Sequence, residues 1–126
     1  MNVCTLTGNL TKDIELNYTP NGTACTRFAL AVRRKFRNKN GEYITDFLSC
    51  VAWNKQAEFL AEYAGKGDKI ELRGSIETRT YEKNGNTVYV TEIMAEEVGI
   101  LNSVKRDEHP IEKVGTRIND DEDLPF

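Results

Sequence analysis

The sequence predicts an all-β fold in which five strands form one domain and one short helix interrupts them. Apolar and polar residues alternate with a period of two through most of the chain before residue 103, which is typical of half-buried strands. Asn-Gly pairs at 40–41 and 84–85 lie between extended runs and indicate two hairpins. A helical period appears once, around 54–64, so we expect one helix between the third and fourth strands.

The first strand is expected over 3–10, and a turn at 20–22 (Pro-Asn-Gly) precedes the second strand. Along 27–33 of the second strand, three larger apolar side chains fall on one face. That face is expected to be core, and its members are Phe28, Leu30 and Val32.

The third strand includes 47–53, and the helix follows it directly. Asn54 is the expected N-cap of the helix, and Gly65 sits where a C′ residue ends it. The fourth strand is expected over 69–81, with the fifth at 87–101 as its hairpin partner. The fourth strand should turn four residues inward: Ile70, Leu72, Gly74 and Ile76. Five strands with a helix between the third and fourth predict an OB-fold, a partly open barrel that binds nucleic acid strands.

The chain of 126 residues predicts one domain with an extension. We place the domain at 1–103, a flexible linker at 104–119 and an acidic, disordered tip at 120–126. The first residues lack a basic segment followed by a long apolar run, so a cytoplasmic protein is expected. Three cysteines without close spacing and a single histidine predict reduced core thiols, no metal site and no cofactor.

Positive charge is concentrated in one run of the domain. Residues 1–103 carry thirteen Lys or Arg and thirteen Asp or Glu, whereas 104–126 carry four against seven. Four cations flank Phe36 in the run, which can be a solvated loop or a surface that follows a phosphate backbone. The predicted phosphate contacts are these four and two arginines of the fourth strand: Arg33, Arg34, Lys35, Arg37, Arg73 and Arg79.

Large aromatic side chains are expected on the same outer surface. Phe47 and Trp53 are six residues apart in the third strand and share a face, opposite the small residues Cys50 and Ala52. Tyr81 is an even number of residues from Arg73 and Arg79, so it is expected on the same outward face of the fourth strand. Exposed rings beside cations stack on the bases of single strands, as in single-stranded DNA-binding proteins.

Two alternatives stay open for these rings. Phe47 and Trp53 could be core residues, with the small residues facing solvent, because large rings are usually buried. Tyr81 could be a cross-strand packing partner of Tyr89.

The last seven residues combine negative charge with an apolar end. Such a segment predicts a docking element for other proteins, because a basic patch can steer its carboxylates and a pocket can accept Phe126. The alternative is a solubilising acidic tail. The tip consists of Asp120, Asp121, Glu122, Asp123, Leu124, Pro125 and Phe126.

The chain resembles the bacterial and phage single-stranded DNA-binding protein (SSB) family. The resemblance spans most of the predicted domain and includes the acidic tip; its segments are 6–13, 18–22, 28–32, 51–58, 67–69, 78–82 and 88–92. It implies a homotetrameric OB-fold that coats single-stranded DNA in replication, recombination and repair. Phe36, Phe47, Trp53 and Tyr81 match the family's base-stacking residues, and the tip matches its docking site for replication and repair enzymes.

The chain departs from the family at three places. Ile14 stands where proline is frequent, Val3 where a basic residue is frequent, and the linker is short. The first two concern a turn and one phosphate contact, whereas a linker of 16 residues spans only about 20–25 Å and limits the reach of the tip. Such a linker would suit a small phage or prophage protein.

Three other functional classes compete with this interpretation. An RNA-binding OB module would have to recognise the 2′-hydroxyl group. A nuclease would need clustered carboxylates or a general base, whereas the acidic residues here are scattered or confined to the tip. A pure adaptor protein would leave Phe36 inside a basic run unexplained.

Overall fold

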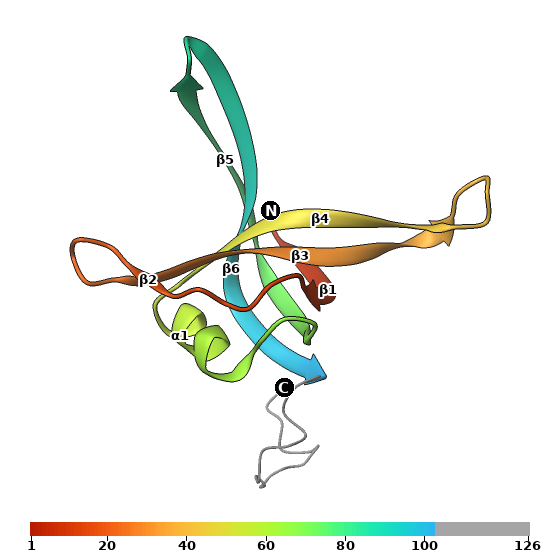
Figure 1. Ribbon diagram of the computed structural model, residues 1–126, viewed down its shortest axis with the longest axis horizontal. Coiled ribbons are helices and arrows are strands. Elements are labelled where there is room, and N and C mark those ends of the chain that lie inside the picture. Colours follow the sequence, from red (N-terminus) through yellow and green to blue (C-terminus); the bar gives the residue numbers. More distant parts are fainter. Residues whose placement is uncertain (103–126) are drawn as a thin grey trace, which may run out of the picture.

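The computed structural model describes residues 1–102, which form one closed barrel with two projecting hairpins (Figure 1). The elements follow in the order β1 (Cys4–Leu10), β2 (Asn17–Tyr18), β3 (Ala24–Arg37), β4 (Tyr43–Trp53), α1 (Asn54–Tyr63), β5 (Lys69–Lys83) and β6 (Asn86–Asn102). The strand order is β1-β5-β6-β4-β3-β2, and pairing of β1 with β3 closes the barrel of the five long strands. The predicted five-stranded barrel and its helix are confirmed, and the two-residue strand β2 is an addition.

Closure of the barrel depends on the N-terminal strand β1. Its residues from Cys4 to Asn9 pair with β5, while Asn9 and Leu10 also pair with β3. Gly8 lies at this crossing, where an added Cβ would come within 2.4 Å of the carbonyl oxygen of Ala31. The close approach of the two strands therefore requires a residue without a side chain.

The core fills the barrel and extends under the helix α1, which lies on one side of it (Figure 1). Leu30 on β3, Leu60 on α1 and Ile70 on β5 are completely buried. The Val98 N–H donates a hydrogen bond of 3.1 Å to Oε1 of Gln56, which ties α1 to β6. Phe28 and Val32 pack partly buried against this core, as their alternation predicts.

The prediction that Asn54 caps the helix is wrong. Helix α1 begins at Asn54 itself. Trp53 occupies the N-cap position, and its side chain makes no capping hydrogen bond. Asn54 has a φ of 56°, because the chain bends sharply from β4 into α1. Asparagine tolerates this left-handed conformation better than most residues.

Both predicted Asn-Gly hairpins are present, and each forms an arm that projects from the barrel (Figure 1). In the β5–β6 arm, Asn84 and Gly85 have φ values of 54° and 80°, as a two-residue turn of type I′ requires. In the β3–β4 arm, Gly41 has a φ of 79°, and the Oδ1 atom of Asn38 accepts bonds from the N–H groups of Asn40 and Glu42.

The arms change two sequence-based expectations. The basic residues 33–37 form the end of strand β3, so only 38–42 remain as the loop. Ile76 was expected in the core but is exposed, because β5 has by then left the barrel and entered the arm. Period-two alternation continues into such an arm although neither face is covered, and the pattern alone does not show where the core ends.

Candidate nucleic-acid interface

The outer face of β3 and β4 presents Phe47 to solvent. Phe47 lies opposite Ala31 of β3 and is 68% exposed, whereas Cys50 and Ala52 are buried in the barrel. Trp53 is half-buried at the end of β4, opposite Cys25. The small residues therefore fill the core and the ring of Phe47 lies outside, so the alternative of a buried Phe47 is removed.

Val51 shares this outer face but is buried. It lies where β6 joins β4 in the parallel pairing of the barrel, opposite Met94. Phe47 precedes this junction and Trp53 follows it, and Phe47 is the more exposed of the two.

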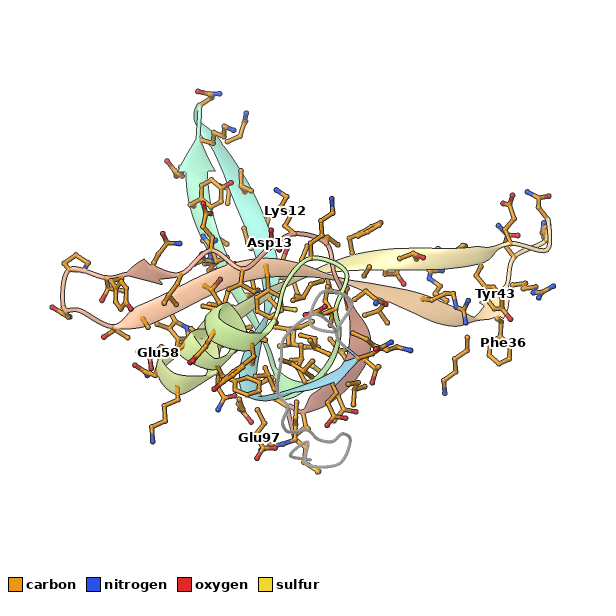
Figure 2. The ribbon with its side chains drawn as sticks, turned by 60° about the horizontal axis from the view of Figure 1, so that its bottom comes forward. Lys12, Asp13, Phe36, Tyr43, Glu58 and Glu97 are labelled. Atoms are coloured by element: carbon orange, nitrogen blue, oxygen red, sulfur yellow. The ribbon has the colours of Figure 1, made fainter. Side chains whose placement is uncertain are left out.

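The β3–β4 arm gathers cations around an aromatic ring. The guanidinium carbons of Arg33 and Arg37 lie 4.3 and 4.9 Å from the ring centroid of Tyr43, within cation–π distance. Phe36 is 82% exposed, and Figure 2 shows both Phe36 and Tyr43 toward the far end of the arm. Sequence reasoning missed Tyr43, although pairing across the turn at 40–41 places it opposite Arg37.

Arg34 has a different environment from its neighbours. Its Nε and Nη2 groups donate hydrogen bonds of 2.9 and 3.1 Å to the two carboxylate oxygens of Asp46 on β4. The hydrogen bond to Arg34 lowers the pKa of Asp46 below its ordinary value, and the same bond raises the pKa of Arg34. A phosphate would have to compete with Asp46 for this guanidinium group.

Tyr81 lies on the β5–β6 arm, next to a cation. It is directly opposite Val88, whereas Tyr89 is opposite Thr80, so the two tyrosines point to opposite faces of the hairpin. The alternative of a Tyr81–Tyr89 packing pair is therefore excluded. The guanidinium carbon of Arg79 is 5.8 Å from the ring centroid of Tyr81.

Arg73 lies apart from the other predicted phosphate contacts, on the barrel part of β5. Its guanidinium donates hydrogen bonds of 3.1 Å to Glu96 and to Glu97 of β6, and the bond to Glu97 raises the pKa of Arg73. It also lines a hollow of about 280 Å³ between residues of β1, β5 and β6. The structure does not bring Arg73 together with the exposed rings.

The remaining predictions concern the tail, metals and membranes. The linker at 104–119 and the tip at 120–126 lie outside the described residues. Within residues 1–102, no three His, Cys, Asp or Glu side chains gather as metal ligands. The same part of the chain contains no helix with the length and apolar character needed to cross a membrane.

Comparison with known proteins assigns the chain to a family. The model of the single-strand binding protein family matches residues 1–101, which is almost the whole described barrel with both arms. The chain belongs to the single-strand binding protein family. The resemblance inferred from the sequence motifs is thereby confirmed.

Relatives within this family have similar sequences over most of the chain. Single-stranded DNA-binding protein 1 of Streptococcus pyogenes serotype M18 is 50% identical over 108 residues, which cover 85% of this chain and 82% of the relative. Single-stranded DNA-binding protein 3 of Streptococcus agalactiae is 41% identical, over 100% of this chain and 99% of the relative. The single-stranded DNA-binding protein of Halalkalibacterium halodurans is 51% identical over 102 residues, and the match covers 61% of that protein.

Proposed function

We propose that this protein binds single-stranded DNA without strong sequence preference and acts as a binding protein, not an enzyme. Its family and the names of its relatives support single-strand binding. The observation that carries the proposal is the exposure of Phe47 and Phe36 on a surface with arginines, where a folded protein has no packing use for such rings. Bases can stack on Phe36, Phe47, Trp53 and Tyr81, and stacking is tolerant of sequence because every base has a π-face.

The backbone of the strand would be held by cations close to these rings. Arg33 and Arg37 lie over the ring of Tyr43 on the β3–β4 arm, and Arg79 lies near the ring of Tyr81 on the β5–β6 arm. Lys35 is exposed on the same arm as Phe36. Arg34 would contribute by exchanging Asp46 for a phosphate. Arg73 is the weakest candidate of the six, because two carboxylates already hold it.

We also propose that the protein assembles as a homotetramer. One edge of β1 supports this: residues Cys4–Gly8 pair with β5 on one side, and within residues 1–102 only Asn9 and Leu10 pair on the other. An open strand edge is a template for another strand, and the same edge of a second copy can pair with it about a two-fold axis. The cytoplasm is the expected location of the assembly.

The tip at 120–126 is proposed to recruit enzymes of replication, recombination and repair. Its composition supports this role, because the carboxylates can steer toward a basic patch while Phe126 enters a pocket. Coating of single strands and recruitment of enzymes would then be separate functions of the domain and the tip.

Fluorescence anisotropy with labelled oligonucleotides tests the proposed binding. Single strands of oligo(dT) and of mixed sequence should bind with similar affinity, and a duplex of the same sequence much more weakly. Matched RNA of the same length serves as the competitor that separates a DNA-binding from an RNA-binding module. Equal affinity for duplex and single strand would contradict the proposal. Tighter binding to RNA than to DNA would identify an RNA-binding module instead.

A further inference from the structure

Two surfaces with exposed rings, one on β3–β4 and one on the β5–β6 arm, meet at a buried carboxylate. Glu92 of β6 is only 7% exposed, and it contacts two arginines from different hairpins. Nη1 of Arg27 on β3 donates to Oε2 of Glu92, and Nε of Arg79 on β5 donates to Oε1 over 3.3 Å. Glu92 therefore fixes a guanidinium group of each hairpin at the place where the hairpins separate.

The position of Arg27 relates it to the rings of the β3–β4 face. Arg27 pairs with Val51, so it lies on the same outer face as Phe47 and Trp53. The pairing register places it about 7 Å from the row of Trp53 and about 14 Å from the row of Phe47, at roughly 3.4 Å per residue. A strand stacked on both rings would pass over Arg27.

Both arginines keep donors for a ligand. A guanidinium group has five N–H donors, and Arg27 uses one nitrogen for Glu92 while Arg79 uses two. Both side chains remain about half exposed, although their shared carboxylate is buried. The unused N–H groups are free to bind phosphate oxygens in a fixed orientation.

We propose that Arg27, Glu92 and Arg79 form a junction clamp, in which Glu92 positions the two arginines and they bind the DNA backbone between Phe47–Trp53 and Tyr81. The proposal rests on the proposed single-strand binding and adds Arg27 and Glu92 to its residues. The clamp joins the two separate ring surfaces into one continuous path for a DNA strand. Sequence reasoning missed it, because Arg27 stands alone in an apolar strand and Glu92 is distant in the chain.

Two substitutions of the carboxylates separate positioning from simple charge. Glu77 lies directly opposite Glu92 in the β5–β6 register, is exposed, and takes part in no ion pair within residues 1–102. Glu92→Gln and Glu77→Gln each remove one negative charge from the same region, so charge alone predicts tighter DNA binding for both. The clamp predicts that Glu92→Gln weakens binding to oligo(dT) severalfold while Glu77→Gln does not.

Arg27, whose side chain is about half exposed, provides a second test that leaves the buried carboxylate of Glu92 in place. Arg27→Ala should weaken binding about tenfold and lower the slope of log affinity against log salt by about 0.7, the value for one phosphate contact on a single strand. Arg27→Lys should restore most of the slope, because it keeps the charge. Lys66→Ala, which removes a positive charge in the loop after α1, is the matched control and should leave affinity nearly unchanged.

The experiment measures anisotropy across a salt series with oligo(dT) of about 4 to 16 nucleotides, the range of site sizes for one OB-fold. The penalty of Arg27→Ala should appear once the oligonucleotide is long enough to span the rows of Phe47 and Trp53, because Arg27 lies between them. Circular dichroism checks that each variant is folded. If the Glu92→Gln variant does not fold, the Arg27 variants alone test the clamp. Normal binding by the wild type together with an unchanged salt slope in Arg27→Ala would overturn the clamp alone, whereas a wild type that binds no single strand would overturn the proposed function.

Discussion

At the residue scale, the alternation of residues along a strand predicted the face on which each side chain lies. It did not predict which side chain of the neighbouring strand would contact it. Alternation placed Phe47 outside and Cys50 inside, because successive residues of a strand point to opposite faces. The pairing of Arg34 with Asp46 depends on the register of β3 against β4, including an irregularity between Arg33 and Arg37. A register of this kind arises from the whole sheet and leaves no local signal in the sequence.

Phe47 is the residue that best tests stacking, because its side chain can be removed without opening the core. Phe47→Ala should weaken binding to oligo(dT) by about 1–3 kcal/mol, the scale for loss of one stacked base, with little change in the free energy of unfolding. Tyr63→Ala on α1 removes another exposed ring and serves as the control. Equal affinities of the Phe47 variant and the wild type in an anisotropy titration would show that this ring does not stack.

Cys50 makes stability depend on alkaline pH. Burial raises the pKa of its thiol to about 12, with a smaller contribution from Cys4, whereas an unfolded cysteine ionises near pH 8.5. Between these values the unfolded state releases a proton that the folded state retains, so the free energy of unfolding falls as pH rises. Urea unfolding at pH 8 and pH 10 should show a fall in the wild type that is smaller in Cys50→Ala. An identical fall in the two proteins would contradict the shifted pKa.

At the scale of elements, the five long strands and their order along the chain followed from alternation and turn chemistry. The Asn-Gly pairs indicated both hairpins, and the structure has left-handed residues there: Gly41 in one turn, and Asn84 and Gly85 in the other. The length of the arms was not predictable, because Ile76 and its neighbours alternate in the same way inside and outside the barrel. The short strand β2 also lacks a signal, as two residues are too few to show a period.

Gly8 tests the closure of the barrel at this scale. Gly8→Ala would place a Cβ 2.4 Å from the carbonyl oxygen of Ala31, so β1 and β3 would have to separate. The substitution should lower the free energy of unfolding by about 1–3 kcal/mol or more. Thr7→Ala, at an exposed position of the same strand, should change it by less than about 1 kcal/mol. Urea denaturation measures both, and a Gly8 variant as stable as the wild type would mean that the crossing is not tight.

At the scale of the whole molecule, the domain and the tip are expected to act separately. Deletion of 120–126 should leave the affinity for single strands unchanged, or raise it slightly at low salt, because the carboxylates compete with phosphate for the cationic surface. The deletion should abolish capture of replication and repair enzymes from a host lysate, and deletion of Phe126 alone should do nearly as much. Capture of the same enzymes by all three proteins would reduce the tip to a solubilising tail.

Assembly is the second property of the whole molecule. The open edge of β1 predicts association, and light scattering of the full chain should report the mass of four copies with and without oligo(dT). A monomer mass at micromolar concentration would contradict the proposed tetramer. It would leave the stacking surface of each barrel intact, because Phe36, Phe47 and Tyr81 lie on hairpins that a single copy already presents.

The central claim, that this surface holds single strands by stacking, is tested most directly by the fluorescence of Trp53, the only tryptophan of the chain. Addition of poly(dT) should quench it to a sharp stoichiometric end point at low salt, and high salt should reverse the quenching as phosphate contacts weaken. Duplex DNA at the same nucleotide concentration should have little effect. Unchanged Trp53 emission while anisotropy shows bound poly(dT), or equal quenching by the duplex, would contradict the account.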